Sequence, residues 1–188
     1  MVNSLGNGGS DLTAPELSRP IKVKGLPGDN VVIEASETEQ AALALRFTLP
    51  GIDNLRAEIA LEQRGKAIRA KGTLKAAIRQ ACAISGEEFP VAISEALDLR
   101  FVEEGSITTS QDENAEIEIE LEAEDCDVIE YSGGAFDLGE AVAQSLGLAI
   151  DPFAEGPDAD AARKKAGIVG EGEQDGPMAE MLKGLTKG

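Results

Sequence analysis

The sequence predicts an α+β fold, in which an antiparallel β-sheet meander is accompanied by two or three helices and flanked by disordered tails. Three long stretches between residues 54 and 102 alternate apolar and polar residues, the period of strands with one buried face. Two segments have the capping residues and apolar spacing of helices. The chain ends are rich in Gly and polar residues, which cannot offset their ordering entropy. We therefore expect a domain over residues 17–153, with residues 1–16 and 154–188 as flexible tails.

Composition excludes several classes of function. The 188 residues carry a net charge of -18, which predicts repulsion from DNA, from bulk nucleic acid and from anionic membranes. The chain has no His, which removes His-dependent catalysis and His metal sites. The start of the chain has no signal-peptide pattern, so we expect a cytoplasmic protein with two reduced cysteines. At 42% hydrophobic and 3% aromatic, its core must be mainly aliphatic.

The first expected elements are two short strands, at residues 17–24 and 31–35, with a turn between them. Pro20 suits a strand start or an edge because proline donates no ladder hydrogen bond. A helix follows at Ser36, which has Glu39 three residues later in the spacing of a capping box. Pro50 and Gly51 are expected to end that helix.

Residues 64–84 form the central strand of the predicted meander and contain six Lys or Arg but no Asp or Glu. Alternation predicts a cationic face made of Arg69, Lys71, Lys75 and Arg79. A bulge at Gly72 would reverse the phase between Lys71 and Lys75. Flanking alternating stretches at residues 55–62 and 89–101 supply its neighbours. The opposite, apolar face comprises Ile68, Ala70, Leu74, Ala76, Ile78, Cys82 and Ile84.

An acidic segment follows, since no Lys or Arg occurs between Arg100 and Arg163. Within it, residues 116–122 alternate Glu with Ile or Leu, which predicts another strand. The acidic face of that strand would carry Glu116, Glu118, Glu120 and Glu122.

The last elements expected are a short strand at residues 128–131, a turn at residues 132–134 and a second helix. Asp137 is the expected cap of this helix, with Glu140 in its first turn. Apolar residues then recur at three- and four-residue spacing until Asp151 and Pro152 end the helix.

No catalytic or cofactor site is recognisable. Cys82 shares the parity of Ile78 and is expected in the core, whereas Cys126 lies among acidic residues that weaken a thiol nucleophile. The chain has no zinc-type cysteine pair and no phosphate-binding glycine loop. We expect a protein that is not an enzyme and binds no metal or cofactor.

The cationic face has two interpretations. Arg69, Lys71, Lys75 and Arg79 could hold phosphates, or they could pair with the glutamates of residues 116–122 across the sheet or remain solvated. The acidic stretch at residues 113–127 could itself hold a basic protein.

Four segments appear in the order seen in one family: LSRPIKV from Leu17, SETEQAALALRFTLPGIDNLRAEIAL from Ser36, GTLKAAIRQACAISGEEFPVAISEALDLRFVEE from Gly72 and FDLGEAVAQSLGLAIDPF from Phe136. Through these, including the Gln80-x-Cys82 and Asp137-Leu-Gly-Glu-Ala motifs, the chain resembles the YceD-like family, and most the alphaproteobacterial branch. Many relatives carry C-x-x-C where this chain has Cys82-Ala-Ile-Ser85.

The resemblance implies a non-enzymatic accessory factor for accumulation of large ribosomal RNA and assembly of the large ribosomal subunit. The implied partner is large-subunit rRNA. The alternative is an acidic, chaperone-like binder of a basic large-subunit ribosomal protein, without direct RNA contact.

Overall fold

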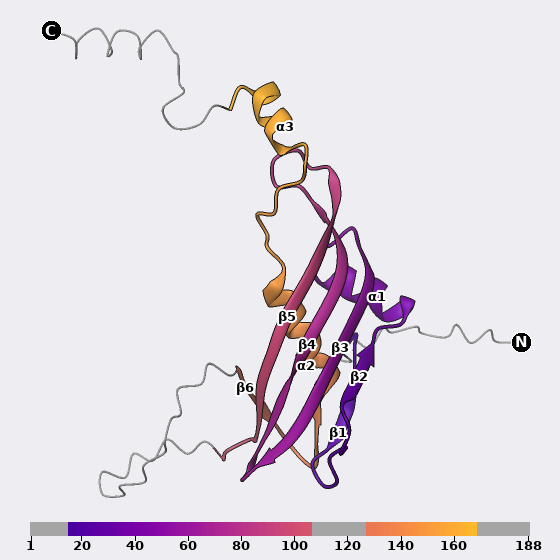
Figure 1. Ribbon diagram of the computed structural model, residues 1–188, viewed down its shortest axis with the longest axis vertical. Helices are drawn as coiled ribbons and strands as arrows, with labels where there is room; N and C mark the ends of the chain where they lie inside the picture. Colours follow the sequence, from indigo (N-terminus) through magenta and orange to yellow (C-terminus); the bar gives the residue numbers. More distant parts are fainter. Residues whose placement is uncertain (1–14, 107–126, 169–188) are drawn as a thin grey trace, which may run out of the picture.

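A five-stranded sheet of long, twisted strands forms the body of the protein (Figure 1). The computed structural model describes residues 15–106 and 127–168. Their strands are β1 (Pro20–Lys22), β2 (Val31–Glu34), β3 (Gly51–Arg64), β4 (Ala67–Ala81), β5 (Glu88–Glu103), β6 (Asp127–Tyr131) and β7 (Ala135–Asp137). Their helices are α1 (Glu37–Arg46), α2 (Leu138–Ala149) and α3 (Ala159–Ala166), which confirms the predicted α+β class.

The predicted meander is present, with one difference at its edge. The order in the sheet is β2-β3-β4-β5-β6, and β2 to β5 are antiparallel neighbours in sequence order. β6 occupies the position expected for a short strand but pairs parallel to β5, where an antiparallel neighbour was expected. Alternation along β6 shows that its residues form a strand, but it carries no information about strand direction.

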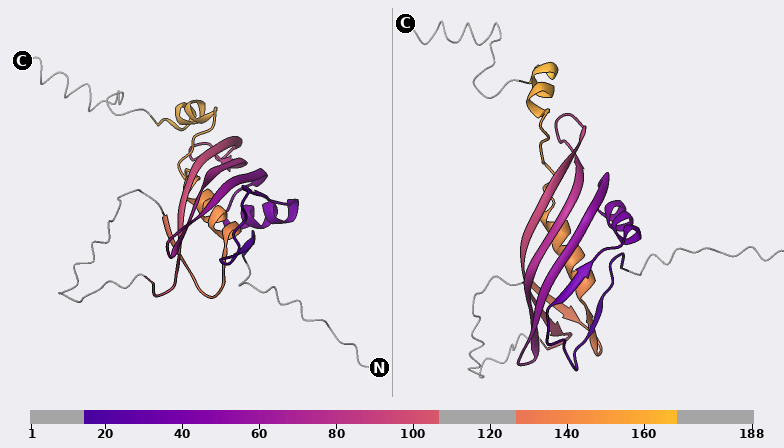
Figure 2. Two further views of the ribbon diagram at one scale, coloured as in Figure 1. Left: turned by 60° about the horizontal axis from the view of Figure 1, so that its bottom comes forward. Right: turned by 45° about the vertical axis from the view of Figure 1, so that its right-hand side comes forward.

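One face of the sheet is covered, and the other is open in the part of the chain that the structure describes. Helix α2 lies against the covered face, as the two views of Figure 2 show. The even-numbered residues of β4 point into this core, which confirms their predicted parity. Ile84 is the exception, because β4 ends at Ala81 and Ile84 lies 36% exposed in the following turn. The largest fully buried side chains are mainly aliphatic: Phe101, Leu17, Ile33, Leu43, Leu55, Ile59, Ile68, Leu74, Ile78, Leu138, Leu146 and Val142.

Helix α1 begins as predicted and ends earlier. The Ser36 hydroxyl accepts from the Glu39 amide at 3.3 Å, and the Glu39 carboxylate accepts from the Ser36 amide at 2.8 Å. The helix ends at Arg46, four residues before the expected stop at Pro50. Thr48 has a φ of 56°, and the Leu49 amide donates back to the Ala44 carbonyl at 2.8 Å. This is a Schellman ending in which Thr48 stands where glycine is usual, so the sequence has no glycine signal there.

A second, two-stranded sheet joins the two ends of the domain. β1 pairs antiparallel with β7, and Pro20 lies opposite Asp137. β1 is shorter than the predicted strand at residues 17–24, and β7 was not expected. The ring of Phe136 in β7 stacks on Phe101 of β5, with centroids 4.2 Å apart, which ties this small sheet to the core.

The segment after α2 contacts the turn between β4 and β5. The Ala83 amide donates to the Ala154 carbonyl at 3.0 Å, and Ala159 in α3 is buried. Residues 154–166 were assigned to a tail because of their polar composition. They are held by contacts with the β4–β5 turn, which no local pattern reports. No helix in the described part of the chain is long and apolar enough to cross a membrane.

Candidate nucleic-acid interface

The open face of the sheet carries the predicted cationic residues. Arg69, Lys71, Lys75 and Arg79 all come from the odd-numbered positions of β4, opposite in parity to the buried residues. Two further cations lie on this face: Arg56 of β3 is in register with Lys75, and Arg100 of β5 is in register with Arg69. Arg56 and Arg100 are not among the predicted contact residues, although their parity in the flanking strands places them on this face.

Asp98 of β5 holds two of the four predicted cations. Arg69 donates to both carboxylate oxygens of Asp98, at 2.9 and 2.8 Å, and Lys71 Nζ lies 3.3 Å from Oδ2. The hydrogen bonds from Arg69, assisted by Lys71, lower the pKa of Asp98 despite its partial burial. Asp98 therefore stays ionised and fixes the Arg69 guanidinium through two hydrogen bonds.

The other two cations differ from each other. Arg79 Nε lies 3.3 Å from Oδ1 of Asp53, in an exposed pair that contributes little stability. Lys75 has no ion-pair partner among the residues that the structure describes. Its ammonium group is therefore available to a ligand at no cost in broken pairs.

A shallow groove runs along this face. Its volume is about 430 Å³, and it is lined by Asn30, Arg56, Glu58, Ala60, Lys71, Gly72, Thr73 and Lys75. The ladders are continuous at Gly72, which pairs with Ile59 on one side and Leu97 on the other. A bulge at this glycine is therefore excluded, and Lys71 and Lys75 lie on the same face. The groove offers ammonium, guanidinium, amide and hydroxyl donors, which suits an anionic backbone such as that of RNA.

The predicted acidic contacts cannot be placed. Glu116, Glu118, Glu120 and Glu122 lie outside the described residues, as does Cys126. Strands β3 and β5 occupy both edges of β4. In the described part of the chain, the acidic partners of the β4 cations are Asp53 and Asp98, on those neighbouring strands.

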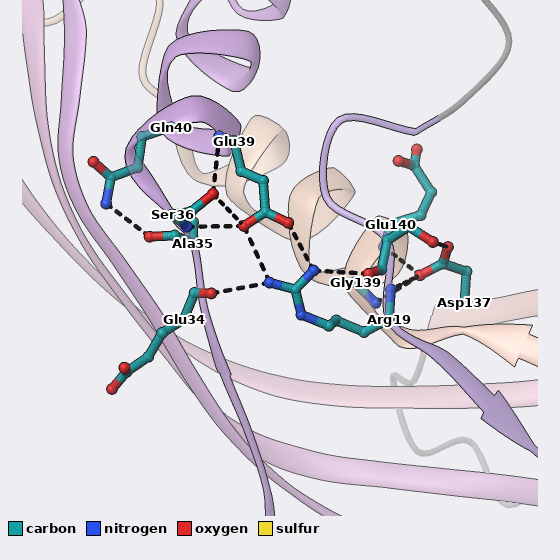
Figure 3. A network of polar contacts seen from close by, with 10 residues as sticks. Arg19, Glu34, Ala35, Ser36, Glu39, Gln40, Asp137, Gly139 and Glu140 are labelled. Atoms are coloured by element: carbon teal, nitrogen blue, oxygen red, sulfur yellow. Dashed lines mark hydrogen bonds and ion pairs between the residues drawn. The ribbon is translucent and has the colours of Figure 1, made fainter.

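A second polar cluster joins the N-terminal segment to the starts of helices α1 and α2 (Figure 3). The Arg19 guanidinium donates to the two oxygens of Glu39, at 2.7 and 3.1 Å, and to the Glu34 carbonyl at 3.1 Å. The hydrogen bond from Arg19 lowers the pKa of Glu39 to about 2. Glu39 thus serves the capping box of α1 and the N-terminal segment at once.

Asp137 is the other centre of this cluster. Its carboxylate accepts from the Arg19 amide at 2.8 Å, the Ser18 hydroxyl at 2.6 Å and the Gly139 amide at 2.9 Å. Burial opposes ionisation, but these hydrogen bonds outweigh it and lower the pKa of Asp137. A Cβ on Gly139 would lie 2.6 Å from the Leu17 carbonyl oxygen. In the Asp137-Leu-Gly-Glu-Ala motif, Asp137 and Gly139 thus make a structural clasp.

Gln80 and Cys82 also have structural surroundings. Gln80 is buried and donates to the Asp151 carbonyl at 2.8 Å. Cys82 is 4% exposed, as predicted, although it packs beside Phe89 and Gly156 outside the main core cluster. Hydrogen bonds from Ser85, Gly156 and Ile84 lower the pKa of Cys82 to about 7. Burial keeps this acidic thiol from reagents in solvent.

No group of three or more Asp, Glu or Cys side chains suited to a metal ion occurs within residues 15–106 and 127–168. The open face carries cationic and polar side chains that could contact an anionic ligand. A family model described as "Large ribosomal RNA subunit accumulation protein YceD" matches residues 70–182, more than half of the chain. Comparison with the curated proteins and with the solved structures found no match.

Proposed function

The chain belongs to the YceD family, and from this premise we propose that it is a non-enzymatic, cytoplasmic accessory factor for accumulation of large ribosomal RNA and assembly of the large subunit. The family name relates the chain to large ribosomal RNA. We propose that the contact is direct and that the open sheet face receives the RNA backbone.

The groove beside Gly72 is the observation that carries this proposal. Lys71, Lys75 and Arg56 line it from two strands, together with the Thr73 hydroxyl. The carboxylate of Glu58 also lines it, accepts from the Asn30 amide at 3.2 Å and lies 3.9 Å from Arg56. Phosphate contacts by Lys and Arg supply most sequence-independent affinity for nucleic acid. Arg69 and Arg79 lie on the same face at the two sides of this set. Their acidic partners hold the side chains in place, so less conformational entropy is lost on binding.

The net charge repels RNA at long range, so the affinity must come from close contacts. A charge of -18 repels RNA, but salt screens it beyond a Debye length of about 8 Å. Within that distance the cations of the face act alongside the carboxylates of Glu58 and Asp98. We therefore expect binding to RNA that is weak at physiological salt and measurable at low salt.

The main test is RNA binding as a function of salt. Roughly four phosphate contacts to single-stranded RNA predict a slope of log K against log salt near -3. Replacing Lys71 and Lys75 with Gln should reduce that slope by about one to two, whatever the RNA sequence. The matched control replaces Lys164 and Lys165, two exposed cations of α3, with Gln. It makes the same charge change and should leave the slope nearly unaltered.

An acidic chaperone-like role, in which the chain holds a basic large-subunit ribosomal protein without touching RNA, remains the second candidate. The excess of 35 Asp and Glu over 17 Lys and Arg favours it. RNA binding that is absent even at low salt, or equal losses in both double variants, would reject the direct contact. Pull-down from a lysate with and without ribonuclease then separates the two, because a basic ribosomal protein retained after ribonuclease supports the chaperone-like role.

A further inference from the structure

The outer edge of β5 is open over most of its length. β6 pairs with β5 only at residues 99–103. No other strand of the described part of the chain pairs with that edge between Glu88 and Asp98. This leaves eleven consecutive residues with one free side, on one of the longest strands of the sheet.

The free backbone groups of this edge can be assigned from the register. The Cys82 amide donates to the Glu87 carbonyl at 2.8 Å, and these two residues continue the β4–β5 register by one step beyond Ala81 and Glu88. Hydrogen-bonded and non-hydrogen-bonded residue pairs alternate along an antiparallel ladder. The odd-numbered residues of β5 therefore direct their amides to β4. The even-numbered residues direct theirs outward, which agrees with Glu104 donating to the Tyr131 carbonyl of β6. Ala92, Ser94, Ala96 and Asp98 thus present outward amides, whereas Pro90 has none to present.

A groove lies along the same edge. One part, of about 210 Å³, is bounded by β5, by Asp127 and by Ser145, Leu148 and Ala149 of α2. A second part, of about 460 Å³, continues past Phe89, Val91 and Ile93 to residues 151–155. The two parts share Glu95 and Ala149 and therefore lie next to each other; together they are called the channel below. Leu148 is 81% exposed and leaves an apolar surface beside the free edge.

The charge of this channel has one sign. Glu95, Asp98, Asp127, Asp151 and Glu155 line it, and none of its lining residues is Lys or Arg. Asp98 and Glu155 have ion-pair partners, Arg69 and Arg163, but Glu95 and Asp127 have none in the described part of the chain. The channel therefore favours a cationic occupant that also has apolar side chains.

We infer that this open edge binds an extended, Lys- and Arg-rich segment of a partner protein as an added strand of the sheet. Outward amides give such a segment its main-chain hydrogen bonds, and the channel receives its alternate side chains. The charge argues against two other occupants, the acidic residues 116–126 of this chain and a second copy of β5, because both would bring carboxylates to carboxylates. Asp98 borders both this channel and the cationic face of β4, but the two proposals rest on different groups, the free backbone amides of β5 here and the Lys and Arg side chains of β4 and β3 there. The peptide test and the RNA test can therefore fail separately.

The test uses the full-length chain and a fluorescent peptide of about twelve alternating Lys and Val residues, long enough to span the free edge. The peptide should bind, and an otherwise identical Glu and Val peptide should not. Residue-resolved amide exchange should slow at Ala92, Ser94, Ala96 and Asp98 when the Lys peptide is added. Val91 and Ile93 should not change, because their amides already face β4.

Two variants test the backbone and the charge separately. Ala96→Pro removes an outward amide and should weaken peptide binding by about tenfold or more. This is the factor expected when one hydrogen bond is lost and the proline ring clashes with the peptide backbone. Glu95→Lys reverses an exposed channel charge and should also weaken binding by about tenfold. The control Glu62→Lys changes the net charge equally on β3, away from the channel, and should bind like the parent chain.

Three results would overturn the inference. The first is that the Glu and Val peptide binds as tightly as the Lys and Val peptide, or that amide exchange does not slow selectively at the even-numbered residues of β5. The second is at least tenfold tighter peptide binding when Ile117, Ile119 and Leu121 are changed to Thr, which would make residues of this chain the occupant. The third is concentration-dependent self-association that Ala96→Pro abolishes, which would make a second copy the occupant.

Discussion

Gly72 is the position where one added methyl group should disturb the sheet most. A Cβ built on it would lie 2.1 Å from the Glu58 carbonyl oxygen and 2.8 Å from the Ile59 Cα. An ordinary carbon to oxygen contact is about 3.3 Å or longer, so the β3 and β4 backbones must separate by about an ångström in Gly72→Ala. Both contacts are with backbone, which cannot rotate away as a side chain can. The strain therefore falls on the ladder itself.

The expected cost follows from two opposing terms. Overpacking of this kind costs about 1–3 kcal/mol or somewhat more when backbone must move. Alanine recovers about 0.5–1 kcal/mol because it loses less conformational entropy than glycine. We expect a net loss of about 2 kcal/mol in the free energy of unfolding, which corresponds to a fall of about 5–10 °C in melting temperature.

Urea denaturation of the variant and of Gly134→Ala provides the test. A Cβ on Gly134 meets no atom within 4 Å, so the same substitution there should leave stability unchanged or raise it by up to about 1 kcal/mol. The midpoint should fall for Gly72→Ala at an unchanged slope. Equal midpoints for the two variants would show that β3 can move at no cost and would refute the reasoning.

Three further predictions concern Glu39, Thr48 and Cys82. The pKa of Glu39 is lowered to about 2 by Arg19, so its contribution to stability is present above pH 4.5 and is lost as pH falls towards 2. The urea midpoint should therefore fall over that range, and fall less in Glu39→Gln. Thr48→Gly should raise the free energy of unfolding by about 1 kcal/mol, because a β-branched residue is strained at a φ of 56°; an unchanged or lower value contradicts the strained ending. Cys82→Ser should lower the free energy of unfolding by about 1 kcal/mol. This is the low end of the roughly 1–3 kcal/mol that a buried polar group without partners costs, because the Ile84 and Ser85 amides can donate to the serine hydroxyl. Rapid thiol labelling of Cys82 in the native parent chain would show that this site is not buried.

The strands of the main sheet could be predicted because their evidence is local. The parity of Leu74 and Ile78 against Lys71 and Lys75 gives the buried and open faces of β4 directly. The starts of α1 and α2 were recognisable because the capping side chains of Ser36 and Asp137 mark them. The Schellman ending at Thr48 was missed because its usual glycine is absent.

Features that depend on distant residues could not be predicted. The parallel direction of β6, the pairing of β7 with β1 and the docking of residues 154–156 on the β4–β5 turn leave no periodic trace. The open face shows the same limit. Its cations on β4 were identified, but Asp98 as their partner required the register between β4 and β5. Arg56 and Arg100 could have been included, because the flanking strands were predicted and both residues have the polar parity of those strands.

The clasp between the N-terminal segment and α2 has a consequence for the order of events during synthesis. Ser18 and Asp137, which it joins, are separated by 119 positions in the chain. At translation rates of about 5–20 residues per second, Leu17 must wait roughly 6–24 s before its binding site on α2 exists. The hairpins of β3, β4 and β5 need only near neighbours and can form within that interval. The first residues of the domain to leave the ribosome are therefore among the last to reach their final place.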